Sequence, residues 1–389
     1  MRILYLDWPC FGKVDTQSTL EQMGHTLIPF FHVDYQKRNS SAFSSAFDTF
    51  VGGEQFDCCF SFNYFPVVSQ CCLQHDLKYI AVVYDSPYVM LYSYTLANPN
   101  NYVFLFDKCE YLTLKNGGLN SVYYTALPVN GNRIEHLLTK TYDKSRLSAD
   151  VSFVGSLYNE DHNFFDRLSG ISDYSRGYLE GIMNAQLKVQ GYNFIEDVLT
   201  PTIVGEMQKS VPYTPDASSA ESEKYVYANY FINRKITSME RQKLLTSVAA
   251  RCALRIYTLN PNAVIPNACN MGAVNYYSEM PYVFANSKIN LNISLRSIQS
   301  GIPLRAMDIM GAGGFLLTNF QTDFLDYFIP NEDFVYYESE NDLLFKVEYY
   351  LTHERERSEI AQNGHEKVKK NHSFEKFFSY IFSVVFRES

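Results

Sequence analysis

Short apolar runs alternate with longer polar stretches along the amino-terminal part of the chain. The first run, 3–6 (ILYL), is followed by a turn-forming stretch and a segment of helical composition. Further runs follow at 27–31, 58–62, 79–84, 102–106 and 121–124. Because the segments between the runs are long enough for crossover helices, the pattern predicts an α/β domain with a parallel sheet over residues 1–148.

A second series of elements begins after the polar stretch 142–150 (YDKSRLSAD), where we place the domain boundary. The strand 151–154 opens the second domain, 149–372, and helical spacing at about 164–230 indicates a helical insertion in it. Strict alternation at 289–295 (INLNISL) predicts a central strand with one polar face. The second domain is therefore also expected to be built around a sheet.

The last segment, 373–389, carries apolar residues at helical spacing, which predicts a helix that packs back on the first domain. A chain of 389 residues has room for two hydrophobic cores. Its apolar fraction of 46% and charged fraction of 19% are typical of globular proteins and argue against disorder and against a coiled coil.

The segment 294–318 combines a strand end, a loop, a short helix and a further strand. Ser300 and Gly301 suit the N-cap of that helix, and Pro303 suits its first turn. An open helix N-terminus at the carboxyl end of a parallel strand offers free N–H groups and a positive dipole end, which is a common site for a diphosphate.

Arg305 and Asp308 stand at positions i and i+3, on one face of this helix. In one interpretation Arg305 clamps a phosphate while Asp308 accepts hydrogen bonds from ribose hydroxyls. In the other, the two side chains pair with each other, which stabilises a helix by only about 0.2–0.5 kcal/mol. The spacing alone leaves both interpretations open.

The net charge of −9 provides no broad positive field, so we expect no nucleic-acid partner. The amino-terminal apolar run is broken at Asp7 and Pro9, unlike a signal peptide, and no stretch approaches the roughly 18 apolar residues of a membrane span. We therefore expect a cytoplasmic protein without a membrane span.

The eight cysteines form no C-x-x-C motif and have no companion histidine pattern, which predicts reduced thiols and no structural zinc. The 31 Tyr and 29 Phe are explained mainly by packing, although sugars also stack on aromatic rings.

Three blocks in the second half, 275–281 (NYYSEMP), 287–292 (SKINLN) and 300–314 (SGIPLRAMDIMGAGG), resemble the spore-maturation, CgeB-like glycosyltransferases. The segment 151–160 resembles the start of the second domain in that family. The first half is similar to the domain that precedes these blocks in the family, at three further places: 7–15, 84–87 and 104–108. The resemblance covers most of the chain apart from the insertion.

The resemblance implies a GT-B fold, in which two Rossmann-like domains face each other across a cleft. It also implies a nucleoside-diphosphate sugar held by the C-terminal domain and a protein, glycan or cell-envelope acceptor that enters from the N-terminal domain. Many retaining GT-B enzymes carry two glutamates around the helix discussed above, at positions that correspond here to Ser300 and Asp308. Because Ser300 has no carboxylate, the first of these two acidic groups is absent, which favours an inverting mechanism.

An inverting transfer needs a general base for the acceptor and neutralisation of the leaving diphosphate. No Asp-x-Asp metal signature follows a strand, so we assign the neutralisation to Arg305, Arg296 and the helix amides and expect neither a metal nor another cofactor. Gly155 and Ser156 permit a close approach of the backbone to the phosphate or the sugar.

Asp15 is the first candidate for the general base, with helix capping as its alternative role. Asp85 follows it, although the adjoining Ser86-Pro87 also suits a turn, and Asp7 is the third candidate. Tyr277, with its neighbours Tyr276 and Glu279, can touch the base or the ribose or can simply pack at a helix start.

Two other functions fit the same scaffold. A sugar-nucleotide epimerase would need an extra acid/base pair near the donor sugar and no open acceptor groove. A non-catalytic nucleotide-sugar-binding or spore structural protein would bind the donor without turnover. The retention of all three candidate aspartates gives no reason to prefer it. The sequence names neither the sugar nor the nucleobase, and it leaves the oligomeric state open.

Overall fold

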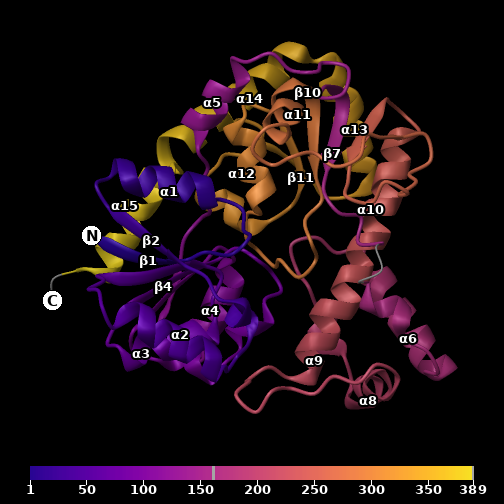
Figure 1. Cartoon of the computed structure of the whole chain (residues 1–389). Coiled ribbons are helices and arrows are strands. Elements are labelled where there is room, and N and C mark those ends of the chain that lie inside the picture. Colours follow the sequence, from indigo (N-terminus) through magenta and orange to yellow (C-terminus); the bar gives the residue numbers. More distant parts are fainter. Residues whose placement is uncertain (160–162, 388–389) are drawn as a thin grey trace. The chain divides into compact units, whose positions relative to one another are not determined.

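The computed structural model describes residues 1–159 and 163–387, which form two compact α/β units (Figure 1). The first unit comprises Met1–Pro128, Thr214–Ser222 and Ser373–Ser389. The second comprises Val129–Tyr213 and Glu223–His372. Glu160, in the block that resembles the start of the second domain, and the last two residues of the predicted terminal helix lie outside the described residues.

The first unit is built on a six-stranded sheet in the order β2-β1-β3-β4-β5-β6, with every neighbouring pair parallel. Its strands are β1 (Arg2–Leu6), β2 (Thr26–Phe30), β3 (Cys58–Phe62), β4 (Tyr79–Val83), β5 (Asn101–Leu105) and β6 (Val122–Tyr124). Each predicted apolar run overlaps one of them, with ends that differ by at most one residue. The central strands β3 and β4 are buried along their whole length, which explains their nearly continuous apolar sequence.

Helices cover both faces of this sheet. They are α1 (Lys13–Gln22), α2 (Ser41–Val51), α3 (Pro66–Gln74), α4 (Lys108–Asn116) and α15 (Phe374–Val385), with short 3-10 turns at Val33–Gln36, Val89–Leu91 and Tyr94–Ala97. The terminal helix α15 packs on the first unit through a buried aromatic stripe, and its Phe378 ring lies 5.6 Å from the Phe60 ring on β3. Burial of this stripe accounts for its apolar sequence.

The second unit has a parallel six-stranded sheet in the order β12-β11-β10-β7-β8-β9. Its strands are β7 (Ala149–Val154), β8 (Leu254–Tyr257), β9 (Cys269–Asn270), β10 (Ser287–Asn292), β11 (Leu316–Asn319) and β12 (Val335–Tyr337). The polar face predicted for β10 is buried: Asn290 accepts a hydrogen bond from Ser152 at 2.8 Å, and Asn292 donates to Thr318 at 2.9 Å. These polar side chains satisfy one another inside the unit, so they cross-link β7, β10 and β11.

Helices of the second unit cover both faces of its sheet, and further helices make up the insertion (Figure 1). They are α5 (Gly131–Leu138), α6 (Asp173–Gln186), α7 (Ile195–Val198), α8 (Pro201–Ser210), α9 (Glu223–Val226), a π-helical turn (Tyr227–Ile232), α10 (Asn233–Ala249), α11 (Met280–Asn286), α12 (Leu304–Gly311), α13 (Glu340–Thr352) and α14 (Glu354–Asn371). Short 3-10 turns lie at Phe164–Arg167 and Thr322–Asp326.

The domain boundary predicted between residues 148 and 149 differs from the structure, in which the chain enters the second unit at Val129. Helix α5 already belongs to the second core, where Ile134 is buried together with Met307. The polar stretch 142–150 is tied to the same unit, since Arg146 pairs with Glu279 and Tyr142 stacks on Tyr282 at 4.6 Å. The sequence pattern does not show the tertiary contacts of these polar residues, which is why the predicted boundary lies about 20 residues too late in the chain.

The insertion is interrupted by Thr214–Ser222, which belongs to the first unit. The backbone N–H of Ala220 donates to the carbonyl oxygen of Tyr92 at 2.8 Å. Arg38 and Glu221 form an ion pair of 3.0 Å whose side chains are buried. This segment therefore holds the loop that follows β4.

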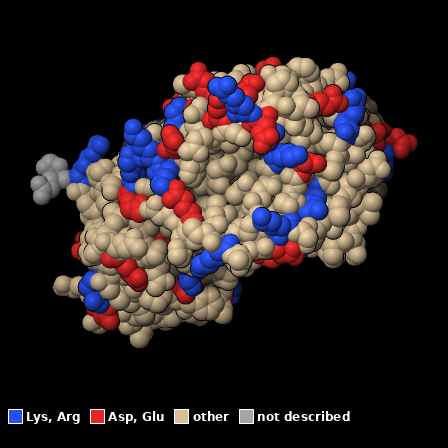
Figure 2. All heavy atoms as spheres, turned by 90° about the horizontal axis from the view of Figure 1, so that it is seen from above, with Lys and Arg blue, Asp and Glu red and all other residues tan. Residues whose placement is uncertain are grey.

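No helix among the described residues is long and apolar enough to cross a bilayer. On the face drawn in Figure 2, Lys and Arg side chains are interleaved with Asp and Glu. This face has no extended basic surface of the kind that follows a nucleic-acid backbone.

Candidate functional site

Helix α12 begins close to the carboxyl ends of β7 and β10. Its N-cap is Pro303, whose backbone is extended (φ −68°, ψ 149°), and no side chain of the described residues caps this end. The prediction of Ser300 and Gly301 as caps is therefore wrong, because the extended backbone continues through Pro303. Ser300 is 2% exposed and its carbonyl oxygen accepts from the Asp323 N–H at 3.1 Å, while Gly301 is buried beside it. The uncapped first turn leaves N–H groups suited to an anion.

Arg305 lies in this first turn, and its guanidinium covers Gly155 at the end of β7. A Cβ atom built on Gly155 would lie 2.6 Å from Nη2 and 2.9 Å from Cζ of Arg305. The backbone of Gly155 also has a φ of +152°, an angle that residues other than glycine rarely adopt. Nη1 of Arg305 reaches Oδ1 of Asn292, the last residue of β10, at 3.5 Å. Glycine at residue 155 thus makes room for the guanidinium.

A second arginine, Arg241 of α10, lies beside Arg305 and is 2% exposed. It donates to the carbonyl oxygens of Ser156 at 2.5 Å and Ile293 at 3.1 Å, in the loops after β7 and β10. Burial, and next the charge of Arg241, lower the pKa of Arg305 to about 10. In the part of the chain that the structure describes, no carboxylate forms an ion pair with Arg305. The strand ends therefore carry concentrated positive charge.

Asp308 is buried one turn further along α12 and accepts a hydrogen bond from the Tyr276 hydroxyl at 3.1 Å. Since Arg305 has no ion-pair partner among the described residues, the helix salt bridge between Arg305 and Asp308 is not formed. Tyr277 packs edge-to-face on Tyr276 at 4.9 Å, and the Cζ of Arg133 lies 5.0 Å from the centre of the Tyr277 ring. Arg133 comes from α5.

Arg296 does not take the predicted role, because its guanidinium is already occupied. Nε and Nη2 donate to the two carboxylate oxygens of Glu240 at 2.8 and 2.6 Å, and Nη1 donates to the Val189 carbonyl oxygen at 2.9 Å. Both side chains of the ion pair are buried. Arg296 therefore anchors the loop after β10 to α10. Glu279, the neighbour of Tyr277, is likewise engaged by Arg146.

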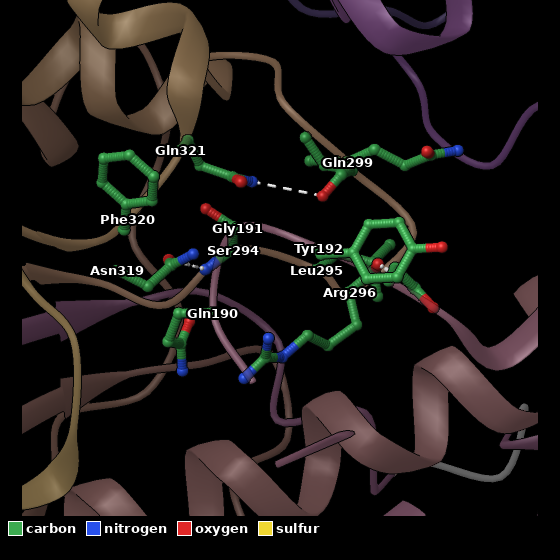
Figure 3. A pocket seen from close by; sticks show the side chains of 12 residues that line it. Gln190, Gly191, Tyr192, Ser294, Leu295, Arg296, Gln299, Asn319, Phe320 and Gln321 are labelled. Carbon is green, nitrogen blue, oxygen red and sulfur yellow. Dashed lines mark hydrogen bonds between the residues drawn. The ribbon is translucent and has the colours of Figure 1, made fainter. Parts of the chain in front are cut away.

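A small pocket lies at the carboxyl ends of β10 and β11, next to the insertion (Figure 3). Its polar lining consists mainly of side-chain amides: Gln190, Asn193, Gln299, Asn319 and Gln321. Two of them already hold backbone groups, since Gln321 donates to the Ile298 carbonyl at 3.2 Å and Asn319 accepts from the Ser294 N–H at 2.8 Å. The cavity of about 10 Å³ has room for water rather than for a sugar.

The three candidate bases lie in the first unit. Asp7 pairs with Lys13, and Asp85 accepts a hydrogen bond from the Asn63 amide at 2.6 Å. Burial raises the pKa of the Cys10 thiol to about 11, with smaller contributions from the charges of Asp7 and Asp85. Both carboxylates therefore act on one thiol at the carboxyl ends of β1 and β4. This edge is where ligands bind in open α/β sheets.

Asp15 lies in the first turn of α1 and is 1% exposed. The N-cap residue of this helix is Gly12, with a left-handed φ of 80°. Asp85 remains exposed, beside the Ser86-Pro87 turn. The structure thus groups Asp7 with Asp85 around Cys10 and buries Asp15.

Comparisons with known proteins show two levels of similarity. A family model described as glycosyl transferase-like matches residues 241–383. No curated protein sequence matches the chain. Among solved structures, a glycosyltransferase from Rickettsia africae is 11% identical with a TM-score of 0.52, and the alignment covers 100% of this chain and 99% of that one. HepE of Anabaena in complex with UDP-glucose is 8% identical with a TM-score of 0.54 and full coverage of both chains, 100% of each.

An α-glucosyltransferase in complex with UDP and a 13-mer DNA is 10% identical with a TM-score of 0.52, again with 100% of both chains covered. At sequence identities of 8–11%, the similarity to these structures establishes the fold of the chain alone. The fold is GT-B. The two parallel six-stranded sheets with their helices are the two Rossmann-like halves of that fold, as the sequence predicted.

Several residues near the candidate sites were not identified from the sequence. Arg241 was visible only as part of a basic helix, and Arg133 lies in a segment that was assigned to the first domain. Cys10 of the first unit lies three residues after the candidate Asp7, but its sequence context gave no chemical signal. Among the described residues, no group of three or more His, Cys, Asp or Glu side chains is arranged to hold a metal ion.

Proposed function

We propose that this protein is a glycosyltransferase that uses a nucleoside-diphosphate sugar bound by its second unit. The observation that carries the proposal is the guanidinium of Arg305, which covers Gly155 at the strand ends without a carboxylate partner among the described residues. An arginine that is partly buried beside a second arginine gains most from a ligand with negative charge.

The diphosphate takes the position in front of the first turn of α12. There the uncapped N–H groups and Arg305 offset the negative charge that develops as the nucleotide leaves. Asp308 lies one turn further along the same helix and accepts hydrogen bonds from ribose hydroxyls. Tyr276, bonded to Asp308 at 3.1 Å, fixes the orientation of that carboxylate.

The similarities support the same assignment. The glycosyl transferase-like match spans Arg241, Arg305 and Asp308. Solved structures of the same fold contain UDP or UDP-glucose, so a uridine nucleotide is the first donor to test. The resemblance of 300–314 to the CgeB-like enzymes suggests that subfamily and a hexosyl or deoxyhexosyl donor.

We infer an inverting transfer without a metal ion, in the cytoplasm, to a protein, glycan or cell-envelope acceptor. The support is Ser300, at the position that corresponds to a glutamate in many retaining GT-B enzymes, together with the arginines that can replace a cation at the diphosphate. Asp85 is the strongest candidate for the base because it is exposed and oriented by Asn63 at the ligand-binding edge of the first sheet. Asp7 is the second candidate.

Calorimetric titration with UDP, GDP, ADP and their common sugar conjugates tests the proposal, with and without EDTA. We expect one diphosphate to bind in the presence of EDTA, and Arg305→Ala to weaken its binding at least about tenfold. The control is Arg251→Ala, which removes an exposed arginine that pairs with Glu348. Equal loss of affinity in both variants, or retention of affinity in Arg305→Ala, would contradict the donor site.

Turnover distinguishes the two alternative functions. Incubation of the donor with candidate acceptors should release free nucleoside diphosphate together with a glycosylated product. Conversion of the donor to an epimeric sugar nucleotide without any acceptor would identify an epimerase. Tight donor binding without either product would identify a binding protein.

A further inference from the structure

A second cavity lies at the opposite edge of the second sheet, near the amino ends of β10 and β11. Its volume is about 350 Å³, within the range of small-molecule sites. It lies between three elements: the start of β10, the turn that leads into β11, and one face of α14. The polar and charged side chains of its lining are Asn286, Ser287, Lys288, Arg357, Ser358 and Gln362.

Arg357 of α14 is a buried charged residue in the lining of this cavity. It is 7% exposed, and its Nη1 donates to the Tyr350 carbonyl oxygen at 2.6 Å. Its other guanidinium nitrogens have no hydrogen-bond partner among the described residues, yet none of them is fully shielded from solvent. Burial lowers the pKa of Arg357, while the charges of Glu354 and Asp150 raise it. One nitrogen thus holds the guanidinium in place, and the other two have N–H groups that can donate to a ligand.

Lys288 is the other charged residue of the lining. Its Nζ pairs with Asp150 at 2.7 Å, and its side chain is 51% exposed. Both charged lining residues are cationic, and neither Asp150 nor Glu354 lines the cavity. The hydroxyl of Ser358 and the acceptor oxygens of Ser287 and Gln362 can bond to the body of a polar ligand, whereas the Asn286 amide is held by Tyr142 and Tyr282.

We propose that this cavity is a binding site for a small organic anion. A phosphate or carboxylate group of the ligand binds to Arg357 and Lys288, and the hydroxyl-bearing remainder lies against the polar groups of β10 and α14. The cavity is larger than inorganic phosphate needs, which favours an anion the size of a sugar phosphate.

This site is distinct from the proposed donor site. The donor site lies at the carboxyl ends of the strands, whereas Ser287 and Lys288 begin β10. A strand of 6 residues separates the two edges by about 20 Å. The inference therefore stands independently of the proposed function.

Calorimetric titration of the full-length protein with glucose 6-phosphate, citrate and inorganic phosphate tests the site, with glucose as the neutral control. The titrations are repeated in Arg305→Ala, which removes phosphate binding at the donor site. We expect glucose 6-phosphate or citrate to bind in both backgrounds, more weakly at higher salt, and glucose not to bind.

Two substitutions act on the cavity by different means. Arg357→Gln removes the buried guanidinium, and Ser358→Glu places a carboxylate in the lining from an exposed helix position that the fold tolerates. Each should weaken anion binding about tenfold or more. Arg355→Gln, on the same helix but outside the cavity, should have no effect, since Arg355 is exposed and pairs with Glu359. Unchanged affinity in folded Ser358→Glu, or no binding of any probe at millimolar concentration, would overturn the proposal.

Discussion

The guanidinium of Arg305 occupies the space that a side chain on Gly155 would fill, with Nη2 only 2.6 Å from the Cβ position. The two residues belong to different elements, the end of β7 and the start of α12, and they meet because the carboxyl ends of parallel strands lie along one edge of a sheet. The Arg305 guanidinium therefore requires glycine at position 155, and a larger residue at position 155 would displace the guanidinium.

Gly155→Ala should displace the guanidinium of Arg305. The added methyl group also has to adopt a φ of +152°, so we expect a loss of about 1 kcal/mol in the free energy of unfolding. Donor affinity should fall about tenfold, as in Arg305→Ala, because the arginine no longer reaches the same position. Urea unfolding and calorimetric titration measure the two effects. Gly177→Ala is the control, since a Cβ on Gly177 in α6 meets no atom within 4 Å.

Arg296 and Glu240 should contribute to stability and not to donor binding. Arg296→Ala leaves the buried Glu240 carboxylate without its partner, so the free energy of unfolding should fall by about 3–5 kcal/mol. The double variant Arg296→Met with Glu240→Leu removes both charges and should recover most of that loss. Urea unfolding tests this pattern. A selective loss of donor affinity in a stable Arg296→Ala protein would instead restore the role predicted from the sequence.

The candidate bases can be ranked by turnover. Asp85→Asn preserves size and the contact to Asn63, so it should leave donor affinity unchanged while lowering kcat by about 100-fold or more. Asp7→Asn removes the ion pair with Lys13 and should have a smaller effect. Initial rates of nucleotide release give both numbers. The ranking would be reversed by an active Asp85→Asn protein together with a folded but inactive Asp15→Asn protein.

The strands of the first sheet, and β7 and β10 of the second, were predictable because buried parallel strands need continuous or alternating apolar residues. The short edge strands β9 and β12 were not predicted. The run 58–62 coincides with β3, and the run 79–84 differs from β4 by one residue. The start of α12 was predicted too early, because Ser300, Gly301 and Pro303 have the composition of a helix start while their backbone belongs to the loop. Composition there did not determine the dihedral angles.

The candidate site was predictable only where its residues follow one another in the sequence. Arg305 and Asp308 share one helix face, and Gly155 ends a recognisable strand. The occupation of Arg296 by Glu240 joins positions from two different elements, as does the approach of Arg241 to Arg305. Such pairings depend on how helices pack on the sheet, for which local spacing carries no signal.

Glu110 provides a prediction about pH. It lies in the first turn of α4, is 9% exposed, and has its pKa raised to about 8 by burial and then by Asp107, while a hydrogen bond with Tyr92 opposes the shift. Between its ordinary value of 4.5 and about 8, the folded protein keeps this proton while the unfolded chain releases it. The contribution to stability is therefore complete below the lower value and is lost as pH rises, by roughly 1 kcal/mol per pH unit.

Glu110→Gln stays neutral at every pH and keeps a hydrogen-bonding side chain beside Tyr92, so it should remove this part of the pH dependence. Urea unfolding at pH 5 and at pH 8 measures the difference, and the variant should exceed the wild type in stability at pH 8. Glu21→Gln, at an exposed position of α1, is the control and should retain the pH dependence of the wild type. The prediction is contradicted if the free energy of unfolding depends on pH in the same way in Glu110→Gln and in the wild type. The Glu110 carboxyl group would then ionise in the folded protein at its ordinary pKa, with its charge solvated by water or by a rearranged Tyr92 loop.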